Sequence, residues 1–161
     1  MTGAVRSGRV LALDIGRKRT GLALSDVTRT LATPYGVITA HPPLGEVMRT
    51  ADHLAAEADG LSAFVVGRPV HLDGRPSAET GDVDAFIARL RTRTSLPVFV
   101  QDERLSSVEA ESRLAVREHD WRKRKAQLDA AAAAVILQDF LDQQAREHDR
   151  DGGQAAQEPI R

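Results

Sequence analysis

The sequence predicts an α/β fold, with one mixed five-stranded sheet and helices on both of its faces. Along the chain the spacing of apolar residues alternates between that of strands and that of helices, in the order β-β-β-α-β-α-β-α-α. The first three strands are joined by links too short for a crossover helix, so they should run antiparallel. Strands one, four and five are separated by helices, so they should be parallel to one another.

The strands are predicted from short apolar runs, which cover residues 9–15, 20–26, 31–39, 62–67 and 97–101. The first run, RVLALDI, is nearly continuous and is interrupted by Asp14. Such a run is typical of a central strand that is covered on both faces.

The helices are predicted where apolar residues recur every three or four positions. They cover residues 44–58, a segment with Val83, Phe86, Ile87 and Leu90 on one face, a segment that begins at Ser106 and Glu109 with capping-box spacing, and an alanine-rich helix over about 126–144. Residues 117–127 are polar and basic, and residues 117–125 are expected to form a loop. Residues 1–8 should be a flexible lead-in, residues 9–144 a single domain, and residues 145–161 a disordered tail without periodicity.

Composition excludes several classes of site. The 161 residues suffice for one domain with a hydrophobic core, and the net charge of -1 gives no overall sign of a nucleic-acid partner. Without cysteine there is no disulfide, thiolate zinc site or cysteine nucleophile, and the five histidines lack metal-ligand spacing. The beginning of the chain lacks the apolar stretch of a secretory signal, and no run approaches membrane-span length, so a cytoplasmic location is expected.

Carboxylates stand where apolar residues are expected. Asp14 shares a strand face with Val10 and Ala12, in what should be the apolar middle of the sheet. An unpaired carboxylate is costly to bury, so Asp14 needs a cation, hydrogen bonds or a place at the exposed end of the strand. The alternative is that Asp14 merely begins a turn before Gly16, which the Asp-x-Gly pattern alone would favour.

Two further acids show the same conflict. Asp129 lies on the core stripe of the alanine-rich helix, although the helix dipole favours an acid in the first turn equally well. Glu103 directly follows the fifth strand, and parallel strands have their carboxyl ends at the ligand crevice. It is equally explained as a surface charge beside Arg104, and the sequence does not decide whether Glu103 or the adjacent Asp102 faces inward.

Taken together, Asp14, Glu103 and Asp129 can converge at one edge of the sheet. Clustered carboxylates repel unless protons or cations neutralise them, and a site with oxygen ligands alone suits Mg²⁺ or Mn²⁺. Two such ions about 3.5–4 Å apart stabilise the attacking and leaving oxygens of phosphodiester cleavage. The expectation is therefore a two-metal phosphodiesterase in which these three residues bind metal and catalyse.

At this point the chain resembles the YqgF/RuvX family, proposed pre-16S rRNA nucleases that were earlier described as proposed Holliday-junction resolvases. The resemblance covers residues 9–144 and rests on LALDIGRKRTGLALSD, ATPYGVI, VVGRPVHLDG, VQDERLSSVEAESRL and LDAAAAAVILQDFL, in that order. It implies a ribonuclease H-like domain with strand order 3-2-1-4-5 and carries the metal triad onto Asp14, Glu103 and Asp129. It also implies a role in maturation of the 5′ end of 16S rRNA.

Basic residues near these motifs are candidates for substrate binding: Arg19, Arg68, Arg122, Lys123, Arg124 and Lys125. Arg68 departs from the family, which usually has Leu there, and His71 stands where Asn is common. Arg68 is at least equally explained as a surface arginine. The last four belong to the basic stretch around Trp121, where charge and an aromatic ring suit phosphate contact and base stacking.

Other function classes compete with the nuclease. Asp-x-Gly on a first strand also opens the sugar-kinase and actin-like ATPase fold, but those proteins enclose ATP between two such domains. A non-catalytic RNA-binding factor in ribosome assembly is a third class, against which the intact triad argues. The expected partner is nucleic acid, with precursor rRNA or the small-subunit precursor preferred over branched DNA. Cutting a four-way junction requires a symmetric dimer, and one core accounts for all the helical stripes.

Overall fold

The computed structural model describes residues 7–103 and 121–155 of the chain, with the side chains of residues 125–151 in the second part. The elements are β1 (Val10–Ile15), β2 (Thr20–Ser25), β3 (Ala32–Ile38), α1 (Leu44–Ala56), β4 (Ala63–Pro69), α2 (Thr80–Arg93), β5 (Val98–Glu103) and α4 (Trp121–Ala155). No helix among these elements is both long and apolar enough to cross a membrane.

The five strands form one mixed sheet in the order β3-β2-β1-β4-β5. β2 pairs antiparallel with both β1 and β3, whereas β4 pairs in parallel with β1 and β5. The predicted α/β class, the strand directions and the ribonuclease H-like order are therefore confirmed. This order makes β1 the central strand, with β4 between it and β5.

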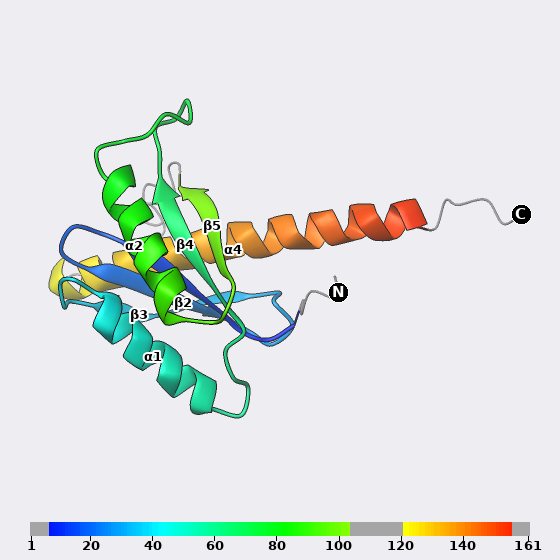
Figure 1. Cartoon of the computed structure of the whole chain (residues 1–161), viewed down its shortest axis with the longest axis horizontal. Helices are drawn as coiled ribbons and strands as arrows, with labels where there is room; N and C mark the ends of the chain where they lie inside the picture. The colour runs from blue at the N-terminus through cyan, green and yellow to red at the C-terminus, as the bar shows by residue number, and fades with distance from the viewer. Residues whose placement is uncertain (1–6, 104–120, 156–161) are drawn as a thin grey trace, which may run out of the picture.

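Helices cover both faces of the sheet, as predicted. α1 and α2 lie on one face and α4 crosses the other (Figure 1). The first core joins Leu11, Leu13 and Phe64 of the sheet to residues of α1 and α2 such as Val47, Leu54 and Leu90. The second joins the smaller Val10, Ala12, Ala23 and Val65 to Ala133, Leu137 and Phe140 of α4. The small side chains let α4 pack close to the sheet.

The alternation of β1 determines which face Asp14 occupies. Side chains of a strand alternate between its two faces, so Asp14 follows Val10 and Ala12 toward the face that α4 covers. Beyond Asp14 the chain turns at Gly16, whose N–H donates to the Arg19 carbonyl over 2.8 Å. A Cβ at Gly16 would stand 2.6 Å from that carbonyl oxygen, so this tight turn requires glycine.

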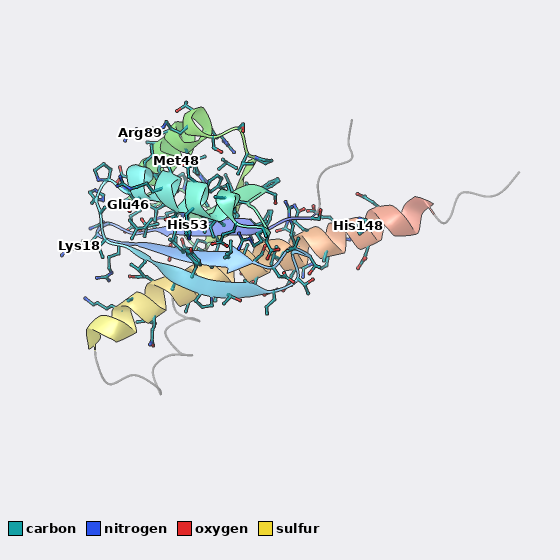
Figure 2. The ribbon with its side chains drawn as sticks, turned by 90° about the horizontal axis from the view of Figure 1, so that it is seen from below. Lys18, Glu46, Met48, His53, Arg89 and His148 are labelled. Atoms are coloured by element: carbon teal, nitrogen blue, oxygen red, sulfur yellow. The ribbon has the colours of Figure 1, made fainter. Side chains whose placement is uncertain are left out.

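α4 differs from the predicted helix at both ends. It begins at Trp121, so residues 121–125 are helical and the expected loop is wrong over that stretch. It also continues beyond residue 144 to Ala155, and residues 145–155 of the expected disordered tail are helical. From Ala145 to Asp151 every residue is exposed, so this part of the helix has no core face and no hydrophobic stripe in its sequence. Figure 2 shows it extending past the sheet.

Some predictions lie outside the described residues. These predictions concern the helix expected to begin at Ser106, residues 117–120 of the expected loop, the first six residues of the lead-in and residues 156–161 of the tail.

Candidate active site

Asp14 and Glu103 meet across β4. They are at the carboxyl ends of β1 and β5, which are not neighbours in the sheet. On β4, the intervening position on the same face is Gly67, which pairs with Gln101 of β5. A Cβ at Gly67 would stand 3.1 Å from Oε2 of Glu103, so the missing side chain leaves the space through which Glu103 reaches toward Asp14.

The contact between the two acids changes the protonation of Asp14. Burial raises the pKa of Asp14 well above its usual value, and the nearby charge of Glu103 raises it further. The side chains of Asp14 and Glu103 also form a hydrogen bond, which favours the protonated form of Asp14. The pair therefore tends to hold a proton between its two carboxyl groups.

The structure also decides between the two adjacent acids of β5. Asp102 is exposed, whereas Glu103 is half-buried and contacts Asp14. Phe99 and Glu103 share a face, and Phe99 packs against Phe140 of α4 with ring centroids 5.1 Å apart. The alternation of β5 thus directs Glu103 toward α4 and Asp102 away from it.

Asp129 of α4 lies near the pair of Asp14 and Glu103, where a second glycine lets the helix come close to the sheet. Gly21 of β2 is the cross-strand partner of Asp14. A Cβ at Gly21 would lie 2.0 Å from the backbone oxygen of Asp129, so this close approach of helix to sheet depends on glycine. The charge of Asp129 is near enough to contribute to the raised pKa of Asp14.

Asp129 has its own partner in Arg19. The Nε atom of Arg19 donates to Oδ2 of Asp129 over 2.6 Å, and both side chains are about one-third exposed, at 34% and 29%. The turn at Gly16 brings Arg19 back to this position, 110 residues away from Asp129 in sequence. Among the described residues, no three acidic or histidine side chains are grouped closely enough to hold one metal ion, and Asp129 is paired with arginine instead.

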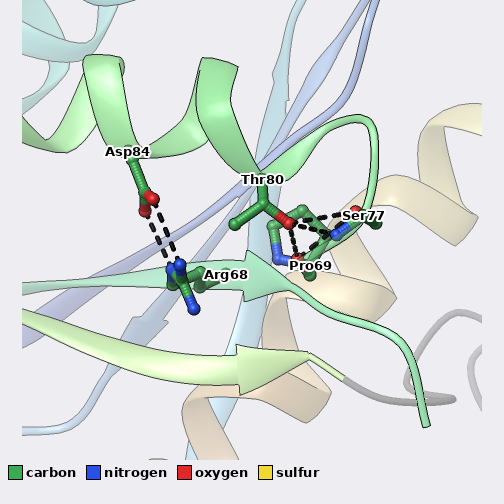
Figure 3. A network of polar contacts seen from close by, with 5 residues as sticks. All are labelled: Arg68, Pro69, Ser77, Thr80 and Asp84. Carbon is green, nitrogen blue, oxygen red and sulfur yellow. Dashed lines mark hydrogen bonds and ion pairs between the residues drawn. The ribbon is translucent and has the colours of Figure 1, made fainter. Parts of the chain in front are cut away.

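Arg68 of β4 is paired with a helix residue. Its Nε and Nη2 atoms donate to the two carboxylate oxygens of Asp84 on α2, over 2.8 and 3.1 Å (Figure 3). Nearby, the Thr80 hydroxyl donates to the Pro69 carbonyl over 2.5 Å and accepts from the Ser77 N–H over 2.7 Å. These contacts join the beginning of α2 to the end of β4. The pairing with Asp84 gives Arg68 a structural role in this junction. The binding of substrate by Arg68 stays a prediction.

The other basic candidates lie at the beginning of α4. Lys125 is exposed and precedes Asp129 by one helical turn, so the two share a helix face. Arg122, Lys123 and Arg124 occupy the preceding helical positions, and their side chains lie outside the described ones. The first turn of α4 contains no acidic residue.

A cavity of about 860 Å³ opens beside the two acids, and both Asp14 and Glu103 are part of its wall. The rest of the wall comes from the turn after β1, the loop before α1, the end of β4 and one side of α2. The apolar part includes Ile15, Pro43 and Phe86.

Comparison with known proteins decides the family. The family model described as "RuvX: Holliday junction resolvase" matches residues 8–143. The chain belongs to this family. The RuvX resemblance found in the motifs is thus confirmed over the region from which it was drawn.

Relatives of this RuvX chain carry an RNA-processing name. A Roseiflexus protein, "Putative pre-16S rRNA nuclease", is 39% identical over 137 residues, 85% of this chain and 96% of the relative. A protein of the same name from Thiobacillus denitrificans is 42% identical over 142 residues, 88% and 97% of the two chains. Among solved structures, Thermus thermophilus RuvC covers 85% of this chain and 96% of its own, with 16% identity and a TM-score of 0.46.

The two glycines were missed by the sequence predictions. Gly21 and Gly67 stand within predicted strands, where glycine weakens a strand and often marks a close approach of another group. That signal was available, but it does not tell which group approaches. The partner of Arg19 was also not predicted, because two residues so distant in sequence meet only through the packing of α4 on the sheet.

Proposed function

We propose that this RuvX-family chain is a metal-dependent nuclease that acts in the 5′-end maturation of 16S rRNA precursor. The observation that carries the proposal is the contact between Asp14 and Glu103 at the carboxyl ends of two parallel strands. Ionising both carboxyl groups of such a pair is unfavourable unless a cation neutralises their charge. The name shared by relatives that match over nearly their full length supports the RNA substrate.

The donor set fits a divalent cation. Asp14, Glu103 and Asp129 offer only carboxylate oxygens, the ligands that Mg²⁺ and Mn²⁺ prefer. Asp14 and Glu103 would hold the cation after losing their shared proton, and Asp129 would join them after leaving Arg19. Two bound ions would neutralise charge that develops on the phosphodiester and lower the pKa of water.

The residues of the chain then have distinct tasks. Asp14 lies between the other two acids, on the central strand, and is the carboxylate that both of them affect electrostatically. Arg19, once separated from Asp129, can donate two hydrogen bonds to a substrate phosphate from the same guanidinium. The basic residues at the beginning of α4 extend this positive charge along the strand of nucleic acid. The reaction belongs in the cytoplasm, where precursor rRNA is made.

Cleavage by the purified chain tests the proposal. Asp14→Asn, Glu103→Gln and Asp129→Asn should each abolish Mg²⁺- or Mn²⁺-dependent cleavage of a 16S precursor fragment while the protein stays folded. Asp102→Asn is the matched control, because this exposed acid is adjacent to Glu103 on the same strand. It should retain near-wild-type cleavage. A triad variant that cleaves as well as the control would remove that residue from the site.

The choice of nucleic acid needs its own comparison. The purified chain should cut precursor RNA in preference to a synthetic four-way DNA junction, and its depletion in the host should cause 16S precursor to accumulate. Symmetric paired cuts in the junction, with the RNA left intact, would assign the chain to junction resolution instead.

A further inference from the structure

We propose that the cavity beside Asp14 and Glu103 binds one unpaired nucleobase next to the phosphodiester that is cleaved. The inference rests on the proposed nuclease function and adds a base-binding subsite to it. Its basis is the position, the volume and the charge balance of the cavity.

Position connects the cavity to the scissile bond. Asp14 and Glu103 line the cavity at the carboxyl ends of β1 and β5, so a group bound in the cavity lies next to the two residues that form the carboxyl pair. A phosphodiester held at that pair has a nucleoside attached on each side. One of those nucleosides is therefore the nearest part of the substrate to the cavity.

The volume fits a nucleoside. Binding sites for small organic molecules occupy roughly 300–1,000 Å³. The cavity, at about 860 Å³, lies within that range and is large enough for one base with its ribose. A base inside a duplex is stacked and paired, so it has to leave the helix to enter a cavity of this kind.

The charges of the wall favour a base over a phosphate. Apart from the carboxyl pair, the wall has two arginines, Arg17 and Arg89, and two acids, Glu79 and Asp82. Arg17 is already paired with Glu79, with Nε and Oε1 3.5 Å apart. The formal charges of these four residues cancel, and the two acids would repel a phosphate. A neutral group that can both stack and form hydrogen bonds suits such a wall better.

The remaining wall supplies the contacts that a base needs. Pro42, which is exposed, and Ile15, which is half-buried, give it apolar surfaces against which a base can stack. Along α2 the wall residues Asp82, Phe86 and Arg89 recur every three or four positions, so one side of the helix faces the cavity. Asp82 and Arg89 thereby offer an acceptor and donors to the edge of a base.

Two alanines of the wall, Ala85 and Ala78, allow the cavity to be filled without changing the core or the carboxylates. Ala85 of α2 is exposed and lines the cavity, and Ala88 is exposed on the same helix but is not part of the wall. Ala85→Trp should occupy the base site, whereas Ala88→Trp is its matched control. Ala78→Trp fills the cavity from a different segment, the stretch before α2, and replaces Ala85→Trp if that variant proves unfolded.

The test uses a 16S precursor RNA fragment whose cleavage position has been mapped with the wild-type chain. Each of the three nucleotides on either side of that position is replaced in turn by an abasic nucleotide. Removing one adjacent base should lower kcat/KM about tenfold for wild type and for Ala88→Trp, a typical loss for one stacked base. Ala85→Trp should cleave the intact RNA about as poorly as wild type cleaves the abasic RNA, and should show no further loss on the abasic RNA.

The outcomes separate the subsite from the nuclease. If wild type cleaves the fragment but no abasic substitution matters, the base site is wrong and the nuclease stands. The same holds if the Ala85→Trp and Ala78→Trp proteins, folded by their thermal transitions, respond to abasic nucleotides as Ala88→Trp does. If wild type cleaves neither this RNA nor a DNA junction with any divalent cation, the proposed function itself fails.

Discussion

Asp14 is a carboxyl group whose ionisation the fold makes unfavourable. It lies on the central strand between Glu103 and Asp129, and its burial and their charges all raise its pKa. A carboxyl group with a raised pKa in the folded chain holds its proton more tightly there than in the unfolded chain. Its contribution to stability is complete below the unfolded-state pKa, about 3.9, and is lost as the pH rises through the folded-state pKa.

Asp14→Asn should therefore stabilise the metal-free protein at neutral pH. The amide cannot ionise, so the variant avoids the buried negative charge, and a gain of about 1 kcal/mol corresponds to about 2–4 °C in Tm for a chain of this size. Thermal unfolding in EDTA at pH 4 and pH 8 measures this, and the advantage should be small at pH 4 and larger at pH 8. A difference that does not change with pH would mean that Asp14 is not the group responsible.

The two glycines of the site should respond differently to alanine. At Gly67 the new methyl group would meet Cδ1 of Ile136 at 2.6 Å and Oε2 of Glu103 at 3.1 Å, both at the ends of flexible side chains. At Gly21 it would meet the backbone of Asp129. Gly67→Ala should fold with a loss of about 1–2 kcal/mol and displace Glu103, so cleavage falls more than stability. Gly21→Ala should lose more stability, because α4 itself has to move.

Cleavage rates and Tm values of both variants, compared with Gly36→Ala, measure this difference. Gly36 of β3 has nothing within 4 Å of an added Cβ, so it reports the effect of alanine in a strand without a collision. If Gly67→Ala cleaves as fast as Gly36→Ala, then Glu103 does not depend on the space at Gly67.

At the level of single residues, the sequence could indicate the three acids but not their arrangement. Asp14 and Asp129 were noticeable because each interrupts an apolar face. β5 is an edge strand with apolar residues on both of its faces, so its alternation did not distinguish Asp102 from Glu103. The pairing of Arg19 with Asp129 depends on how the helix packs on the sheet, which no local pattern encodes.

At the scale of elements, the beginning of α4 combines two opposing requirements. Its first turns hold Arg122, Lys123, Arg124 and Lys125, although the positive end of the helix dipole disfavours cations there. A local rule broken in this way is typical of functional segments, where binding outweighs stability. These four residues are one to two turns before Asp129 in the sequence of the helix, and we propose that they contact nucleic acid bound at the site.

Replacing all four residues with alanine should weaken RNA binding and flatten its dependence on salt. Each phosphate contact that is lost should reduce the slope of log K against log [salt] by about 0.7 for a single strand. Fluorescence titrations at several salt concentrations measure the slope. Arg146→Ala combined with Arg150→Ala is the control, because both arginines are exposed far along the same helix. If the fourfold variant keeps the wild-type slope, the stretch does not contact phosphate.

The strands were predicted to within two residues, but the limits of α4 were not. β1, β2 and β4 are recognisable because each is a short run of buried apolar residues. The beginning of α4 is basic and its end is exposed, so neither end has a hydrophobic stripe. Periodicity detects the part of a helix that packs on a core, and here that part is only the middle of α4.

For the whole molecule, cation binding should be visible as added stability. A cation that binds only the folded chain stabilises it by about 2.7 kcal/mol at one hundred times its Kd, or roughly 5–11 °C in Tm. Adding Mg²⁺ or Mn²⁺ should therefore raise the Tm of the wild-type chain and clearly less that of Asp14→Asn. Sodium chloride at matched ionic strength is the control. Equal shifts in both proteins would place the bound cation elsewhere.

The architecture as a whole followed from the sequence because several weak signals agreed on it. Link lengths decided which strands run antiparallel, and the intervening helices decided which run parallel, so the directions in the sheet were limited before any contact was known. The cavity beside the acids was not predictable in this way. Its wall combines five separate segments, and only their packing creates the cavity.

The order of the elements along the chain also affects how the protein emerges from the ribosome. Synthesis exposes the sheet, α1 and α2 before α4, so Val10, Ala12 and Val65 have no cover on one face until α4 is made. A nascent chain in that state presents an apolar sheet surface to chaperones and to other nascent chains. Asp129 is likewise made after Asp14 and Glu103, so the proposed site is completed only once α4 has been synthesised.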